Sequence, residues 1–372
     1  MSNACNTAAI LTREHFSGHE QACAPQYAQA PGMIAGLDAA ACKQAEAVLD
    51  VVESLATGRG SEAARLARTG ANWGLRRRHD RYWSARLATD GAGRSPAQHL
   101  PKLTRTFGSS LLATPCGLEP GPDGNLWVAS LGGERLTALS PQGELVRQVP
   151  LPGVRPFGLF AGAAGALWVC DLSRPRLLEI TPDGAPGRSL ALESGGLRPL
   201  RGVVHGDEMF LILVNAQCEA RQLARLDLCQ AVPAGAGVRV ELLPCPIRNL
   251  SGVELRDGQL YVSGQNPPVL LRRPLHGGEW SNASQGMLPE YLTQFGFRGA
   301  DTWLAARHHL ARLDAKGALD IVMDAGSQSG YSGCSFCDLA FLKGQDSDAI
   351  YLTDNINDVI HHFEITHSSP VS

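Results

Sequence analysis

One phrase recurs along this chain and constrains the fold more than any other feature. The segments PCGLEPGPDGNLWVAS (115–130) and PFGLFAGAAGALWVCD (156–171) share one order: Pro-x-Gly-Leu, a glycine-rich turn and Leu-Trp-Val. Fainter copies of the phrase begin at Arg201, Ser251, Arg298 and Cys337. Six copies at intervals of about 40 to 50 residues match the period of propeller blades, in which no single unit buries both of its faces.

Each copy divides into short alternating apolar runs split by Gly, Asp and Pro, which is typical of antiparallel strands joined by tight turns. The sixth copy supplies only three such runs before Ser372, whereas the alternating segment PKLTRTFGSS (101–110) precedes the first copy without a blade of its own. We therefore predict an all-β, six-bladed β-propeller over residues 101–372. In this fold the N-terminal segment adds the fourth strand of the last blade and closes the ring.

Residues 1–100 have a different pattern, and we predict a small α-helical N-terminal extension there. Asp38 is placed to cap one helix that ends near Gly58, and Ser61 is placed to cap a second. The second helix carries the basic run GLRRRHDR (74–81) beside aromatic residues. We interpret this run as a solvated or docked helix face, because it belongs to no recognised nucleic-acid-binding motif.

Composition and charge exclude several classes of partner. The formal net charge is −3 and the pI is near 6.4, which does not favour nucleic acid or an anionic membrane. The longest strongly apolar run, Met209–Val214, is too short to span a bilayer, and the N-terminus lacks the pattern of a signal peptide. We predict a cytoplasmic protein without nucleic-acid or membrane partners, whose ten cysteines are free thiols.

The phrases GPDGNLWVAS, PFGLFAGAAGALWVCD and LLEITPDG resemble repeats of the streptogramin B lyase group and of the wider NHL and SMP-30 propellers, over residues 115–184. For the lyases, the resemblance implies catalytic histidines at the x position of Pro-x-Ala/Gly-Ile, close to magnesium. Here the matching positions carry no histidine: they are Cys116, Phe157, Arg201, Ser251, Arg298 and Cys337.

For the gluconolactonase-like SMP-30 proteins, the resemblance implies a divalent metal on the axis, held by Glu, Asn and Asp. Glu119 and Asp354 are of the residue types that this resemblance implies for the metal ligands. The Glu-Gly-Pro start of that family is missing from this chain.

Propellers place function at the mouth of the axial channel, so the x positions are the predicted ligand-binding residues. Arg201 and Arg298 can converge on one carboxylate or phosphate, since guanidinium groups bind such anions through paired hydrogen bonds. The alternative is that each arginine pairs with a nearby acid, such as Glu254 or Asp301. Three further x positions complete the predicted ligand-binding set: Ser251, Phe157 and Cys116.

Three acids follow the glycine of their copies by two residues: Glu119, Glu254 and Asp301. Carboxylates that converge near an axis can hold a hard divalent cation such as Ca²⁺ or Mg²⁺. An arginine–acid lattice explains the same residues without a metal, and the sequence leaves both interpretations open.

Two further pairs of residues carry potential chemistry. Cys334 and Cys337 form a lone CxxC at the start of a predicted strand, without the helix N-terminus of a redox motif or the second pair of a zinc site. We interpret them as structural thiols, with a three-thiol cluster including Cys116 as the alternative. His361 and His362 are adjacent on a predicted third strand, so we expect one of them to face solvent.

The sequence supports two hypotheses and does not decide whether the protein is an enzyme. In the first, a non-catalytic propeller binds a partner protein or a small anionic ligand at the axial channel mouth. In the second, a metal-assisted lyase or hydrolase acts there on a lactone or ester, with the three acids as ligands and the arginines stabilising an oxyanion. Convergence of the acids would favour the enzyme, and arginine–acid pairs filling the axis would favour the binding protein.

Overall fold

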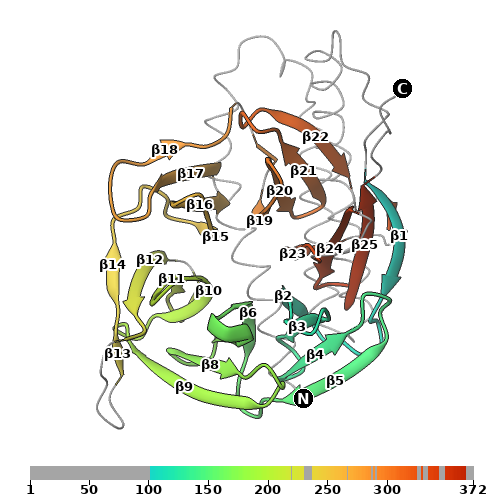
Figure 1. Ribbon diagram of the computed structural model, residues 1–372, viewed down its shortest axis with the longest axis horizontal. Helices are drawn as coiled ribbons and strands as arrows, with labels where there is room; N and C mark the ends of the chain where they lie inside the picture. The colour runs from blue at the N-terminus through green and yellow to red at the C-terminus, as the bar shows by residue number, and fades with distance from the viewer. Residues whose placement is uncertain are drawn as a thin grey trace, which may run out of the picture. The chain divides into compact units, whose positions relative to one another are not determined.

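The computed structural model describes residues 101–365, except for 219, 230–236, 266, 286–287, 290, 325–327, 330–333 and 343–347. These residues form six sheets arranged in a ring (Figure 1), which confirms the predicted six-bladed propeller. The predicted α-helical extension, residues 1–100, lies outside the described residues. In the described part of the chain, no helix is long and apolar enough to cross a membrane.

Each blade is an antiparallel sheet numbered here in chain order from its inner to its outer strand. Blade 1 comprises β2 (Pro115–Pro120), β3 (Leu126–Ser130), β4 (Arg135–Leu139) and β5 (Leu145–Pro150). Blade 2 comprises β6 (Pro156–Ala161), β7 (Leu167–Asp171), β8 (Arg176–Ile180) and β9 (Pro186–Glu193), with the short 3₁₀ turn η1 (Ala163–Gly165) after β6 and β13 (Val238–Arg239) parallel to β9. Blade 3 comprises β10 (Arg198–His205), β11 (Glu208–Val214), β12 (Arg221–Asp227) and β14 (Glu241–Leu243).

The remaining blades follow the same order. Blade 4 comprises β15 (Leu250–Arg256), β16 (Gln259–Gln265), β17 (Pro268–Pro274) and β18 (Ser281–Asn282). Blade 5 comprises β19 (Leu292–Arg298), β20 (Asp301–Ala306), β21 (His309–Leu313) and β22 (Leu319–Asp324). Blade 6 comprises β23 (Phe336–Ala340), β24 (Asp348–Asp354), β25 (Val359–Ile365) and, as its outer strand, β1 (Lys102–Phe107).

The first described strand closes the ring. β1 pairs antiparallel with β25, with Leu103 opposite Phe363 and Phe107 opposite Ile360. This pairing confirms the predicted N-terminal closure and satisfies the strand edge that β25 would otherwise expose. It also buries both His361 and His362, contrary to the expectation that one of them faces solvent, because β1 covers the strand on which they lie.

A register shift near the start of every inner strand identifies equivalent positions in the six blades. The residues at the x position are Cys116, Phe157, Leu200, Ser251, Thr293 and Cys337. The sequence alignment was therefore one residue late in blade 3. In blade 5 it took the β19–β20 hairpin for an inner strand, because Leu292-Thr293-Gln294 carries neither the proline nor the glycine of the phrase.

The glycine of Pro-x-Gly is required by close approach between neighbouring inner strands. A Cβ atom on Gly117 would lie 2.4 Å from the carbonyl oxygen of Phe157, and one on Gly158 would lie 2.2 Å from that of Leu200. Only glycine leaves room for the next blade's backbone at these seams. The phrase recurs because it brings inner strands together at the axis.

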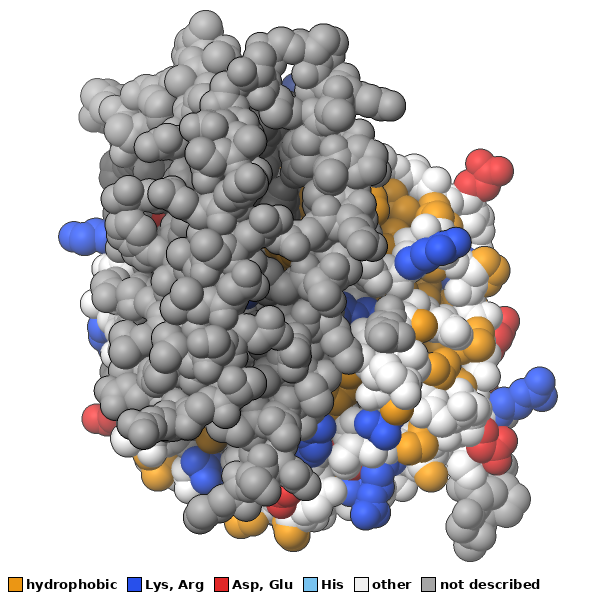
Figure 2. Space-filling view, turned by 180° about the vertical axis from the view of Figure 1, so that it is seen from behind, with side chains coloured by type: hydrophobic (Ala, Val, Ile, Leu, Met, Phe, Trp, Pro, Cys, Tyr) orange, Lys and Arg blue, Asp and Glu red, His pale blue; other side chains and the backbone are white. Residues whose placement is uncertain are grey.

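The tryptophans of Leu-Trp-Val pack between blades. Trp127 lies in an apolar cluster with Leu159 and Val169 of blade 2, and Trp168 lies in one with Met209 and Leu211 of blade 3. On the described part of the face drawn in Figure 2, basic and acidic side chains stand among apolar ones, and neither charge covers that part alone. The described surface therefore gives no reason to look away from the axis for a ligand.

Candidate functional site

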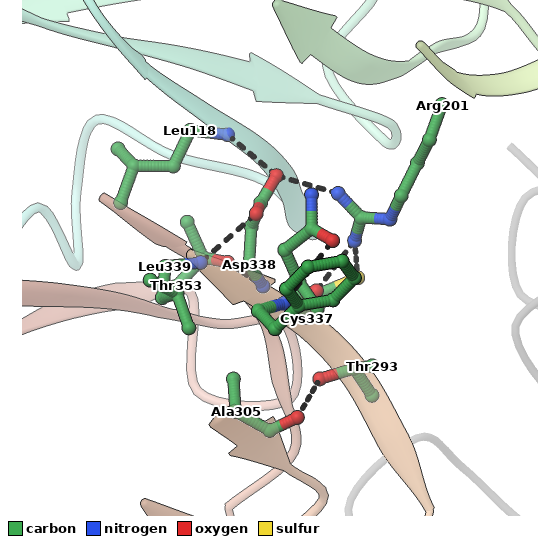
Figure 3. Close-up of polar contacts among 10 residues, drawn as sticks. Leu118, Arg201, Thr293, Ala305, Cys337, Asp338, Leu339 and Thr353 are labelled. Carbon is green, nitrogen blue, oxygen red and sulfur yellow. Dashed lines mark hydrogen bonds and ion pairs between the residues drawn. The ribbon is translucent and has the colours of Figure 1, made fainter. Parts of the chain in front are cut away.

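A buried ion pair between Arg201 and Asp338 crosses the propeller axis (Figure 3). The Nη1 atom of Arg201 lies 2.7 Å from Oδ2 of Asp338, and their side chains are only 5% and 3% exposed. Arg201 comes from β10 in blade 3 and Asp338 from β23 in blade 6, which are opposite one another in a ring of six. The pair therefore closes the axial channel instead of lining one of its walls.

Backbone groups of two more strands hold this ion pair. Arg201 donates a second hydrogen bond, from Nη2 to the Cys337 carbonyl oxygen, at 2.5 Å. Asp338 Oδ2 accepts a hydrogen bond from the Leu118 amide at 3.1 Å, and the Asp338 amide donates to Thr353 Oγ1 at 2.9 Å. These contacts join β10, β23, β2 and β24 around one carboxylate, so the ion pair is a fixed part of the fold.

Burial opposes both charges, and the partners oppose that effect. Burial lowers the pKa of Arg201, but the Asp338 carboxylate and the nearby thiols raise it further, so the pKa lies above its ordinary value. Burial raises the pKa of Asp338, and the Arg201 guanidinium counteracts this rise. Arg201 thus remains a cation whose charge is neutralised inside the protein.

Two thiols from neighbouring blades adjoin the guanidinium. Cys116 of β2 and Cys337 of β23 are both buried, and Cys337 Sγ lies 4.0 Å from Nη2 of Arg201. Interaction with the Cys116 thiol lowers the pKa of Cys337, and the charges of Arg201 and Arg221 lower it as well. The same interaction raises the pKa of Cys116, so Cys337 carries the thiolate character of the pair.

A second arginine of blade 3 stands near this cluster without an acidic partner. Arg221 begins β12 opposite Val214, at the end of the blade where the inner strands begin, which we call the mouth. It is partly buried and donates from Nη1 to the Leu250 carbonyl oxygen at 2.7 Å. Among the described residues no carboxylate pairs with it, and burial lowers its pKa. A desolvated guanidinium of this kind attracts an anion.

The structure brings together some of the predicted ligand-binding residues and separates others. Arg201, Phe157 and Cys116 lie together: the Arg201 guanidinium is 5.8 Å from the centre of the Phe157 ring. Ser251 is buried and hydrogen-bonded to Ser263 within blade 4, at 2.8 Å between the hydroxyl oxygens. Arg298 ends β19, at the opposite end of its inner strand, where it donates to the Ala349 carbonyl oxygen at 3.3 Å.

The three predicted metal-binding acids do not form one cluster. Glu119 and Glu254 occupy equivalent positions on the inner strands β2 and β15, which belong to opposite blades. Asp301 instead begins β20 and lies 3.6 Å from Arg312. Among the described residues, the one group whose ligand atoms converge as in a metal site is elsewhere, in blade 6.

Glu254 has an unusual environment although it has no cation-binding neighbours. Burial raises the pKa of its carboxyl group to about 8, the Asp338 carboxylate adds to the rise, and Arg201 counteracts it. None of the described residues donates a hydrogen bond to it. At neutral pH Glu254 is therefore mostly a neutral acid near the buried ion pair.

Two residues of this site were missed by the sequence analysis. Asp338 occupies the position of the Pro-x-Gly glycine in blade 6, and this departure from the repeat was a usable signal. Arg221 lies outside the repeated phrase, and only the arrangement of β12 beside β10 and β15 places it at the mouth.

No family model matches this chain, and neither does any curated protein. Solved propellers share its fold. They include a gluconolactonase of Xanthomonas campestris (TM-score 0.56, 14% identity, 73% of this chain and 99% of that chain) and a streptogramin B lyase (TM-score 0.52, 11% identity, 74% and 100%). Regucalcin of Agrobacterium tumefaciens, described as a calcium-binding protein, is similar as well (TM-score 0.55, 13% identity, 73% and 96%). These likenesses confirm the architecture expected from the repeats, and at such identities they show the fold alone.

Proposed function

We propose that this propeller binds a small organic anion, a carboxylate or phosphate ester, at the axial mouth beside Arg221. The observation that carries the proposal is the charge state of the two arginines of blade 3. The charge of Arg201 is neutralised by Asp338 at 2.7 Å, whereas Arg221 contacts a backbone carbonyl and no described carboxylate. A bound anion would compensate this second, partly buried charge.

The surroundings of Arg221 suit a ligand of limited size. The ion pair closes the axis below it, so a ligand would rest on the mouth and would not thread the channel. Phe157 and the thiols of Cys116 and Cys337 adjoin the ion pair and offer an apolar floor. A guanidinium beside an apolar floor favours an anion that carries an organic group, since each part of the ligand then has a partner.

The alternative, a metal-assisted lactone or ester hydrolase, receives less support from these residues. The axial acids that would hold its cation are spread over opposite blades, and Asp301 is near Arg312 instead. The similar gluconolactonase contributes the fold and no residue-level argument. A buried arginine–acid pair at the axis was the arrangement expected of a binding protein.

The experiment is a calorimetric titration of the full chain with benzoate, inorganic phosphate and glycerol 3-phosphate, with benzamide and glycerol as neutral controls. The wild-type protein should bind at least one of the three anions, and Arg221→Gln should weaken that binding about tenfold or more. Arg272→Gln, which removes an exposed arginine of β17, is the matched control and should leave binding unchanged. Equal binding by the Arg221→Gln variant, or no anion binding by the wild-type protein, would overturn the proposal.

A further inference from the structure

Blade 6 contains a cluster of buried side chains that differs from the axial site in chemistry and location. Cys334, Asp354 and His361 are all fully buried, and their potential ligand atoms lie within 4.8 Å of one another. Cys334 precedes β23, Asp354 ends β24 and His361 lies on β25. We propose that these three residues bind a divalent transition-metal ion of the zinc class, which stabilises the blade that closes the ring.

Blade 2 shows what the same aspartate does without a metal. Asp171 ends β7 as Asp354 ends β24, and each accepts a hydrogen bond at Oδ1 from the amide just before its inner strand, at 3.1 Å. The partner amides belong to Arg155 and Ser335. In blade 2 the buried carboxylate is neutralised by Arg176, whose Nε lies 2.7 Å from Asp171 Oδ2.

Blade 6 lacks that arginine. Val359 stands opposite Asp354, in the position where Arg176 stands opposite Asp171. A buried carboxylate needs a compensating positive charge, and a histidine and a cysteine occupy the space beside this one. A divalent ion held by the Asp354 carboxylate, a Cys334 thiolate and a neutral imidazole would bring the net charge of the group to zero.

The distances agree with tetrahedral coordination. His361 Nε2 lies 3.2 Å from Asp354 Oδ2. Two ligand atoms at about 2.0 to 2.1 Å from one tetrahedral ion would lie about 3.3 Å apart. This distance also fits an ordinary hydrogen bond, so it permits a metal and does not require one.

Neighbouring hydroxyl groups orient two of the ligands as metal sites require. Thr106 Oγ1 lies 3.0 Å from His361 Nδ1 and can accept its proton, which leaves the Nε2 lone pair for the ion. Ser329 Oγ lies 3.1 Å from Cys334 Sγ and can donate to a thiolate. Since Thr106 belongs to β1, a bound ion would also connect the closing strand to the rest of the blade.

The test uses the full chain, purified through a tag that does not bind metal and without chelators. We expect about one equivalent of Zn²⁺ per chain by elemental mass spectrometry. After exchange with Co²⁺ we expect the visible absorption of a tetrahedral site and a thiolate-to-cobalt charge-transfer band. Cys334→Ser should abolish that band, and His361→Gln should lower the metal content.

Cys170→Ser is the matched control, because Cys170 is an equally buried thiol outside the cluster. This variant should keep both the metal and the band. The proposal is overturned if folded wild-type protein holds no stoichiometric metal and takes up neither Zn²⁺ nor Co²⁺ when they are added. A charge-transfer band that persists in Cys334→Ser would overturn it as well, and an imidazolium at His361 would then be the counter-charge of Asp354.

Discussion

Arg201 and Asp338 belong to opposite blades and meet across the propeller axis, with 2.7 Å between Nη1 and Oδ2. The two residues are 137 positions apart in the chain. Each is also tied to the backbone of blade 6 or blade 1, through Cys337 and Leu118. One interaction thus links three inner strands and makes the centre of the ring a rigid floor beneath the mouth.

Breaking this ion pair from one side should be strongly destabilising. Arg201→Met would leave the Asp338 carboxylate buried without its counter-ion, and we expect the free energy of unfolding to fall by about 3 to 5 kcal/mol. Urea unfolding followed by circular dichroism measures this loss. The double variant Arg201→Met/Asp338→Leu should lose less than the sum of the two single variants, because it leaves no unpaired charge.

The control for that experiment is an exposed ion pair of the same chain. Arg225 and Glu241 lie 2.6 Å apart, but their side chains are 39% and 59% exposed. Arg225→Met should therefore cost only about 0 to 1 kcal/mol. If Arg201→Met proved no more costly than Arg225→Met, the axial pair would not be the buried, desolvated contact described above.

Glu254 should make stability depend on pH in a direction opposite to that of a salt-bridged acid. Its pKa is raised to about 8 in the folded protein from an ordinary value of 4.5. Between these values the folded state binds more protons than the unfolded state, so this group's contribution to stability is complete below pH 4.5 and decreases as pH rises toward 8. The slope approaches about 1.4 kcal/mol per pH unit for one proton.

Glu254→Gln isolates this effect, because glutamine mimics the neutral acid at every pH. Unfolding free energies of the variant and the wild type should be measured at half-unit steps from pH 5 to pH 8.5. The variant should gain stability relative to the wild type as pH rises, with little further change above pH 8. A constant difference over this range would mean that the Glu254 carboxyl group titrates normally.

The sequence was sufficient for the architecture because the determinants of a blade are local. Pro-x-Gly sets the inner-strand seam, glycine turns set the hairpins, and the unpaired segment 101–110 required a partner strand. The axial site was harder to predict, since its residues meet only when the ring closes. Asp338 departs from the repeat by one glycine, and nothing local to Arg221 indicates that blade 4 supplies its carbonyl partner.

The closing strand should contribute to stability through its inward-facing side chain. Leu103 of β1 packs against the apolar cluster that contains Phe363 and Ile365, whereas its neighbour Lys102 is exposed. Leu103→Asp would place a charge against that cluster, and we expect a loss of about 2 to 4 kcal/mol in urea unfolding. Lys102→Asp is the control and should stay within about 0.5 kcal/mol of the wild type. Equal effects of the two changes would argue against the pairing of β1 with β25.

The seam between blades 2 and 3 should not tolerate a methyl group at Gly158. Its Cβ would lie 2.2 Å from the Leu200 carbonyl oxygen and 3.1 Å from the Cα atom of Arg201, and both are backbone atoms that cannot rotate away. Relieving the clash requires β6 and β10 to separate, which would also move Arg201 relative to Asp338. We expect Gly158→Ala to cost about 1 to 3 kcal/mol, as overpacking of a tight interior does. Gly133→Ala is the control, since its nearest neighbours are Arg135 side-chain atoms at 3.4 Å, and thermal unfolding should show little change or a slight gain. A Gly158→Ala variant as stable as Gly133→Ala would mean that the inner strands are not in contact at this seam, and the repeated Pro-x-Gly phrase would need another explanation.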